Sequence, residues 1–313
     1  MTPAYNLRVG KAADRLLLRD LLARTASLLD LADYRYVGLG GPFLEDFRLI
    51  HDAFPMMKLS SVERKEHVWR RQKFHRPSRY LELHHCGIDH YFANLHDDSE
   101  RVVLWLDYTG LNHNLLKEVW GVIPRLSAGS ILRVTLRAEG AEETGLEERK
   151  KWAQETFGSY LPDDFTTDEL DTPEFPKVLL RAVRKMIENA TANLPDIDFQ
   201  LVNAVYYDDG TQMMTITGLL ADSEQRREMR RVLQNWEFKN FNWTKPFSLA
   251  LPALSLKERF TLEPLLPSRR GTGKALYQKL GYSIEDSKTE SLTALDNYRR
   301  LSEAYPRFAR IAF

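Results

Sequence analysis

Apolar and polar positions along the first 220 residues alternate or cluster in a way that predicts strands separated by helices. The run 101–106 is continuously apolar, which is typical of a strand buried on both faces of a parallel sheet. Shorter or alternating runs occur at 34–37, 57–62, 80–84 and 130–136. Because these runs are spaced by roughly 20–30 residues, the pattern predicts βαβ units and a parallel sheet with right-handed crossovers.

Between and after these strands, apolar residues recur at the spacing of amphipathic helices. The predicted helices lie within 12–31, 43–54, 111–123 and 175–191. Two further apolar runs, 199–207 and 213–219, flank an Asp-Asp-Gly-Thr turn, which is a strong hairpin signal. The pattern therefore predicts an α/β fold. We expect a Rossmann-like three-layer sandwich with a mostly parallel seven-stranded sheet, an antiparallel final hairpin and a helical C-terminal extension.

The rhythm of the elements divides the chain into three predicted parts. Residues 1–31 form an N-terminal cap helix, 32–220 the Rossmann-like domain, and 221–313 the C-terminal extension. An acidic insertion at about 139–198 interrupts the alternation of strands and helices. The sequence leaves open whether this insertion is a lid, an interface or a partner site.

Composition and charge narrow the class of protein. Lys plus Arg (44) balance Asp plus Glu (44) over 313 residues, so no global field directs the chain to nucleic acid or membrane. A single cysteine, Cys86, excludes an intrachain disulfide and fits a reducing compartment. No apolar run approaches membrane-span length, and the N-terminus lacks the apolar region of a signal peptide. We therefore expect a cytoplasmic protein without a membrane segment.

Residues 34–47 combine a short strand, a glycine turn and the start of a helix. The turn contains Gly38, Gly40 and Gly41. A strand that turns through glycines into a helix lets a ligand lie against bare backbone near a helix N-terminus. The spacing is GxGG rather than GxGxxG, so an ordinary glycine turn is the alternative interpretation.

Five parallel-type strands followed by an antiparallel hairpin resemble class I S-adenosylmethionine-dependent methyltransferases over roughly residues 10–220. Three shorter motifs carry a narrower resemblance: Arg8-x-x-Lys11-x-x-x-Arg15, Gly-Gly-Pro-Phe-x-x-Asp-Phe-x-x-x-His51, and the Trp-Leu-Asp-Tyr turn. They resemble a bacterial group described as putative O-methyltransferases, whose relatives are associated with mobile and antiviral-defence gene neighbourhoods.

The resemblance implies S-adenosylmethionine as cofactor and assigns a binding role to the strand ends. The glycine turn would face the methionine part, and Glu63, at the end of the second strand, would hold the ribose hydroxyls. Residues after the third strand would lie by the adenine: Cys86, Gly87 and Ile88, with Asp89 as a further candidate. Glu63 could instead pair with a basic neighbour.

The end of the fourth strand would face the reacting methyl group. We expect Asp107 to orient the acceptor or act as base, and Tyr108 to shape the slot; the alternative is that Asp107 caps the next turn or helix. Two departures from the superfamily matter. The acidic residue usual before the first glycine is absent, and Asp107-Tyr-Thr-Gly replaces the Asp/Asn-Pro-Pro-Tyr of enzymes that methylate amino groups of nucleic acids. The acceptor is therefore left as an oxygen or nitrogen nucleophile.

A basic stretch with interleaved aromatic residues, 64–79, follows the second strand. Arg70 and Arg71, with Arg8 and Lys11 near the N-terminus, are candidates for binding substrate or phosphate. The alternative is a solvated helix whose arginines face water. A second hypothesis is a catalytically silent methyltransferase-like module that binds nucleic acid or a protein partner.

A nicotinamide-linked enzyme is a third reading, which the GxGG spacing and the final antiparallel hairpin oppose. A homo-oligomer is compatible with the sequence. His84 and His85 are adjacent in a strand and would point to opposite faces, so we expect no metal site.

Overall fold

The computed structural model describes residues 8–55, 57–141, 145–171, 174–266 and 272–302. The chain divides into two compact units. The larger comprises Arg19–Tyr206 and Gly210–Phe247. The smaller comprises Met1–Leu18, Tyr207–Asp209 and Ser248–Phe313. The domain boundaries expected at residues 31 and 220 stay predictions.

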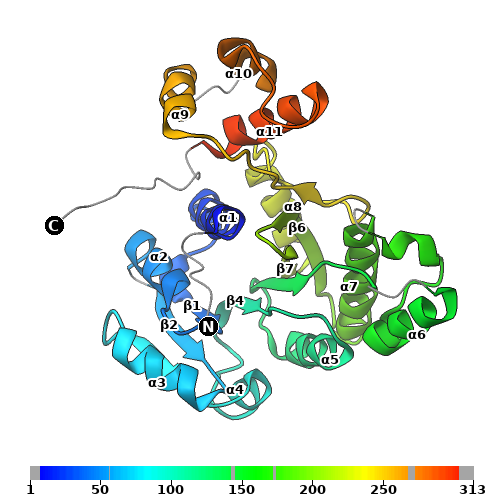
Figure 1. Cartoon of the computed structure of the whole chain (residues 1–313). Helices are drawn as coiled ribbons and strands as arrows, with labels where there is room; N and C mark the ends of the chain where they lie inside the picture. Colours follow the sequence, from blue (N-terminus) through cyan, green and yellow to red (C-terminus); the bar gives the residue numbers. More distant parts are fainter. Residues whose placement is uncertain (1–7, 56, 142–144, 172–173, 267–271, 303–313) are drawn as a thin grey trace. The chain divides into compact units, whose positions relative to one another are not determined.

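The described strands form an eight-stranded sheet of order β3-β2-β1-β4-β5-β7-β6-β8 (Figure 1). Their bounds are β1 (Tyr34–Gly38), β2 (Lys58–Val62), β3 (Leu81–His84), β4 (Arg101–Asp107), β5 (Ile131–Arg137), β6 (Asp198–Asp208), β7 (Gln212–Ala221) and β8 (Phe247–Ser248). Strands β1 to β5 pair in parallel, and β7 runs antiparallel to β5. The predicted mostly parallel sheet with its final hairpin is confirmed, and the two-residue strand β8 is an addition at the edge.

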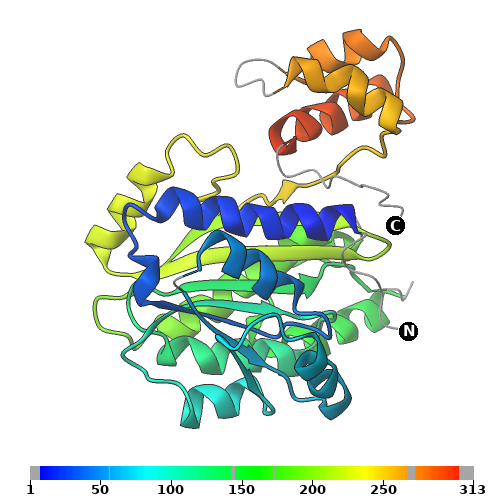
Figure 2. The ribbon, with the colours of Figure 1, turned by 90° about the vertical axis from the view of Figure 1, so that its left-hand side faces the viewer.

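Helices connect the strands of the sheet and continue after its last strand. Their bounds are α1 (Val9–Thr25), α2 (Glu45–Ala53), α3 (Glu66–His75), α4 (Ile88–Asn94), α5 (His113–Val122), α6 (Leu146–Phe157), α7 (Phe175–Thr191), α8 (Ser223–Val232), α9 (Leu256–Leu262), α10 (Gly273–Leu280) and α11 (Lys288–Leu301). Tyr36 of β1 packs edge-on against Phe47 of α2, with ring centroids 5.0 Å apart. Val37, on the opposite face, joins a core with residues of α4, α5 and α7. Helices α2 and α4 therefore lie on opposite sides of the strands (Figure 2).

The smaller unit has a core of its own. Leu262, Leu276, Leu295 and Tyr298 bring α9, α10 and α11 together. The carboxylate of Asp209, in the hairpin turn, accepts hydrogen bonds from the first backbone N–H groups of α1, at Gly10 and Lys11. A carboxylate at this position stabilises a helix N-terminus. Every described helix is too short or too polar to span a bilayer.

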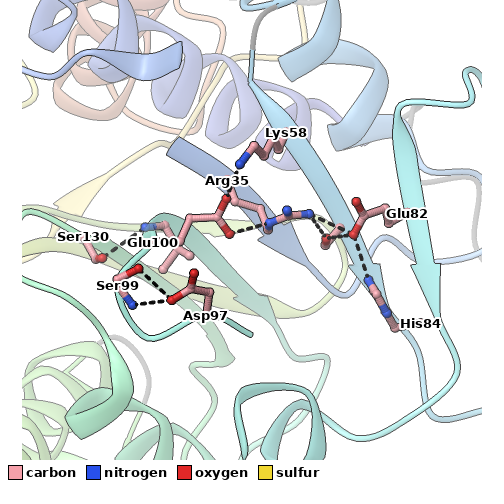
Figure 3. Close-up of polar contacts among 10 residues, drawn as sticks. Arg35, Lys58, Glu82, His84, Asp97, Ser99, Glu100 and Ser130 are labelled. Carbon is pink, nitrogen blue, oxygen red and sulfur yellow. Dashed lines mark hydrogen bonds and ion pairs between the residues drawn. The ribbon is translucent and has the colours of Figure 1, made fainter. Parts of the chain in front are cut away.

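A polar network ties together the amino ends of the first strands (Figure 3). Arg35 donates to Glu100 at 2.7 Å and to Glu82 at 2.9 Å, and Lys58 also donates to Glu100. His84 lies 3.4 Å from Glu82, and burial lowers the pKa of His84. Arg35, Lys58 and Glu100 lie at or just before the amino ends of their strands, away from the carboxyl ends where ligands of open α/β sheets bind. His84 is the last residue of β3 and extends the network toward the carboxyl edge.

Candidate active site

The glycine turn follows β1 at the carboxyl edge of the sheet. Gly40 and Gly41 have φ angles of +68° and +52°, a region that glycine adopts readily and other residues rarely do. A Cβ on Gly40 would lie 2.6 Å from Ser61 Oγ and 2.8 Å from Phe47 Cε2. A Cβ on Gly41 would meet no atom within 4 Å. The turn therefore packs closely against Ser61 and Phe47 at Gly40, whereas its backbone is open at Gly41. A ligand that lies against backbone needs such an open position.

A buried glutamine from α3 fixes the shape of this turn. The Gln72 side-chain amide donates to the carbonyl oxygens of Leu39 at 3.2 Å and Gly41 at 2.9 Å. Its oxygen accepts from Ser61 Oγ at 3.1 Å. Gln72 is fully buried, so each of these hydrogen bonds would be costly to lose. Gln72 was not among the predicted site residues, because a polar residue within a charged helix gives no sign in the sequence that it packs inward.

Glu63 lies beside the glycine turn, one strand over. In the parallel register Gly38 is opposite Ser61, so Glu63 leaves β2 at the same edge. Its backbone N–H donates to His84 O at 3.0 Å, which joins the segment after β2 to β3. One carboxylate oxygen, Oε1, accepts from the Lys65 N–H at 2.6 Å. In the described part of the chain the other oxygen, Oε2, has no hydrogen-bond partner and can accept one from a ligand.

The segment after β3 forms the next part of the edge. Gly87 is the N-cap of α4, and the Asp89 side chain folds over it, since a Cβ on Gly87 would lie 2.3 Å from Asp89 Oδ1. Ile88 is buried in the core, so only its backbone can face a ligand. Cys86 is partly buried; burial, with a contribution from Asp89, raises the pKa of its thiol. These residues lie where the sequence placed them, and their contact with adenine stays a prediction.

Asp107 is the last residue of β4 and Tyr108 follows it. The N-cap of α5 is Asn112, whose side chain accepts from Leu115 N–H, so Asp107 does not cap that helix. Tyr108 is buried and its N–H donates to Thr135 O at 3.0 Å. Burial, followed by the nearby charge of Glu118, raises the pKa of Tyr108. Tyr108 therefore keeps its proton at neutral pH and cannot serve as the base.

Charged side chains gather around the Tyr108 hydroxyl. Glu118 of α5 is half-buried; burial and Asp89 raise the pKa of its carboxyl, while Arg64 opposes the rise. Arg64 follows β2 and Asp89 begins α4, so three strand ends contribute to this cluster. Glu118 and Arg64 were not among the predicted site residues, because local spacing does not encode how α5 packs.

Replacing Glu118 by glutamine should stabilise the protein at neutral pH. A carboxyl whose pKa is raised by folding binds its proton more tightly in the folded state. Its ionisation therefore costs stability as the pH rises through the folded-state pKa. Below about pH 4 the group is protonated in both states and the cost is absent. We expect E118Q to melt above the wild type at pH 7–8, with the difference vanishing near pH 4.

Thermal melts followed by circular dichroism would measure this difference. Glu155→Gln, on an exposed face of α6, is a control with the same change of charge. A difference for E118Q that does not vary with pH would contradict the assignment.

The four cations predicted to bind substrate have different surroundings. Arg70 is exposed and pairs with Glu66 at 2.7 Å. The Arg71 guanidinium lies 4.8 Å from the centroid of the Phe43 ring, two residues beyond Gly41. Lys11 is buried and pairs with Asp14 at 3.6 Å. Arg8 precedes α1, and Arg8 and Lys11 both belong to the smaller unit. The structure thus brings Arg71 near the turn, and the binding roles of all four cations stay predictions.

The neighbouring histidines lie apart. His84 packs against Tyr91, with ring centroids 4.9 Å apart, and His85 stacks on Trp69 at 4.8 Å. Among the described residues, no group of three or more His, Cys, Asp or Glu is placed to hold a metal ion.

A parallel sheet in this strand order, with a glycine turn after β1, a carboxylate after β2 and an antiparallel final hairpin, defines the class I methyltransferase architecture. The protein is an enzyme of the methyltransferase class. A family model described as "Putative O-methyltransferase" matches residues 3–313. The chain therefore belongs to the putative O-methyltransferase family.

Solved structures with a similar fold share little sequence with this chain. A putative caffeoyl-CoA O-methyltransferase from Staphylococcus aureus is 10% identical, with a TM-score of 0.35 over 64% of this chain and 83% of its own. The plantazolicin methyltransferase BamL, crystallised with a triazolic desmethylPZN analog and SAH, is 9% identical, with a TM-score of 0.41 over 69% and 88%. Cofactor-bound Rv0187 from MTB is 12% identical, with a TM-score of 0.39 over 70% and 89%. No curated protein matches this sequence.

Proposed function

We propose that this protein transfers a methyl group from S-adenosylmethionine to an oxygen nucleophile. One observation carries the proposal: bare backbone at Gly41 lies at the same sheet edge as the available carboxylate oxygen of Glu63. These two features fit the two ends of the cofactor, because its methionine part needs close approach to backbone and its ribose needs an acceptor for two hydroxyls. The family supports oxygen as the acceptor atom.

For methyl transfer the protein has to position the two reactants and provide a proton acceptor. When bound, S-adenosylmethionine supplies an electrophilic methyl group on a sulfonium. The Gly38–Gly41 turn, shaped by Gln72, would hold the methionine part, and Glu63 the ribose. Asp107 would align the acceptor hydroxyl and take its proton, while Tyr108 and the core behind it close the slot.

The first test of the proposal is Glu63→Ala. Loss of one charge-assisted hydrogen bond from the ribose to Glu63, worth about 1.5–3 kcal/mol, should weaken binding of S-adenosylhomocysteine by roughly ten- to a hundred-fold. Isothermal titration calorimetry measures the change. The matched control is Glu66→Ala, three residues further on, where an exposed carboxylate pairs with Arg70 and faces no strand end.

The titration separates the proposal from its alternatives. Wild-type protein should bind the cofactor or its demethylated product with one site per chain. If neither ligand gives heat or a thermal shift, the proposed function is wrong. If both Glu63→Ala and Glu66→Ala bind as the wild type does, Glu63 is not part of the site.

A further inference from the structure

A surface beside the glycine turn carries positive charge and exposed aromatic rings. Residues 64–79 hold seven Lys or Arg against one Glu. Six exposed side chains of α3 and of the segment leading to β3 form what we call the α3 surface. They are Arg71, Lys73, Phe74, Arg76, Arg79 and Tyr80. The protein as a whole has no net charge, so this excess of positive charge is confined to one part of the chain.

The cations of the α3 surface are not neutralised within the protein. Among the described residues, no carboxylate pairs with Arg71, Lys73, Arg76 or Arg79. The Arg76 guanidinium donates to the backbone carbonyls of Ser78 and Arg79. Three arginines of α7 and α8 differ, since each has a glutamate partner one turn away: Arg184 with Glu188, Arg227 with Glu224, and Arg231 with Glu228. Arg71 and Lys73 instead lie over the rings of Phe43 and Trp69. Surface cations without carboxylate partners, at close spacing, suit an external polyanion.

The aromatic side chains of the same surface are strongly exposed. Phe74 is 85% exposed and Tyr80 75%, the highest values among the large apolar side chains described. Phe74 meets His75 edge-on at 5.1 Å, and Tyr80 lies 6.3 Å from His51 of α2. Rings held by neighbours but open on their outer side are platforms on which unpaired bases can stack.

The α3 surface adjoins the candidate active site. Arg71 lies over Phe43, which follows the glycine turn by two residues. Phe43 in turn packs edge-on against His75 at 5.1 Å. Gln72 of the same helix bonds Gly41 O. A polymer held along α3 would therefore pass close to the edge where the methyl group is transferred.

We propose that the α3 surface binds single-stranded RNA and that this RNA carries the methyl acceptor. Spaced cations match its phosphates, and exposed rings match its unpaired bases, which a duplex would hide. RNA is favoured over DNA because its ribose 2′-hydroxyl provides an oxygen acceptor. Transfer to that oxygen forms a C–O bond and breaks the C–S bond of the sulfonium, and the hydroxyl proton passes to Asp107. This inference rests on the proposed function.

Fluorescence anisotropy with a labelled single-stranded RNA of mixed sequence tests the proposal. The double variant Lys73→Gln/Arg79→Gln should weaken binding and lower the slope of log K against log salt by about 1.4, since each single-strand phosphate contact contributes about 0.7. Phe74→Ala/Tyr80→Ala should weaken binding roughly ten-fold or more, with the salt slope unchanged. All four side chains are exposed, so the fold should tolerate these changes.

The control is Arg227→Gln/Arg231→Gln, which removes the same charge from paired residues of α8 and should leave RNA binding unchanged. Tritium from labelled S-adenosylmethionine should enter the RNA and not a DNA strand of the same sequence. No RNA binding, equal losses in the control, or labelling of DNA would overturn the inference. Cofactor titration on the same samples keeps the two proposals apart, because heat with the cofactor but no RNA binding refutes only this one.

Discussion

Replacing Asp107 by asparagine is expected to lower the rate of methyl transfer by about 10²–10⁴-fold, the usual contribution of a positioned proton acceptor. Asn is nearly the same size, so packing at the end of β4 should be kept. The amide cannot take the proton released when the acceptor oxygen is methylated. Cofactor affinity should change little, because the methionine and ribose contacts are assigned to other strand ends.

The rate can be measured without a known acceptor. Tritium transfer from labelled S-adenosylmethionine into a cell extract, fractionated into nucleic acid, protein and small molecules, gives the rate and the acceptor class together. Asp98→Asn, an exposed carboxylate before β4, serves as control. A D107N protein that transfers label as fast as wild type would remove Asp107 from the mechanism. Cofactor binding without transfer into any fraction by the wild type would support the silent module.

The adjacent glycines of the turn should respond to substitution in opposite ways. A methyl group on Gly40 collides with Ser61 and Phe47 and forces a residue with a side chain to φ +68°. Gly40→Ala should therefore lower the free energy of unfolding by about 2–4 kcal/mol. Gly41 faces open space, and asparagine tolerates its φ of +52°. Gly41→Asn should fold nearly as well as wild type but fill the space assigned to the cofactor.

Urea unfolding and cofactor titration of the two variants separate these effects. For Gly41→Asn we expect cofactor affinity to fall by roughly a hundred-fold. The reason is that the added side chain would crowd the ligand at a cost of about 3 kcal/mol. Normal cofactor binding by Gly41→Asn would show that the bare backbone does not face the ligand. A stable Gly40→Ala variant would show that the turn is less tightly packed than described.

The strands were predictable because a buried strand appears in the sequence as a run of apolar residues. The continuous run at 101–106 and the Asp-Gly hairpin located β4, β6 and β7 within about two residues. The prediction omitted α4 and α6, since α4 is a single short helix and α6 is mainly charged. Strand β8, with two residues, has no pattern to detect.

The candidate site was predictable where a residue's place follows from its own strand. Glu63 and Asp107 fall at strand ends, so their common edge follows from topology. Gln72 and Glu118 reach that edge from helices, and helix orientation depends on packing that local spacing does not encode. The distinction between Gly40 and Gly41 also required coordinates, because both have positive φ and only their neighbours differ.

A crystal structure of the protein with S-adenosylhomocysteine tests the central claim most directly. We predict the homocysteine part against the backbone of Gly38–Gly41 and the ribose hydroxyls within hydrogen-bond distance of the Glu63 carboxylate. A ligand bound elsewhere, or one with its ribose away from Glu63, would contradict the account.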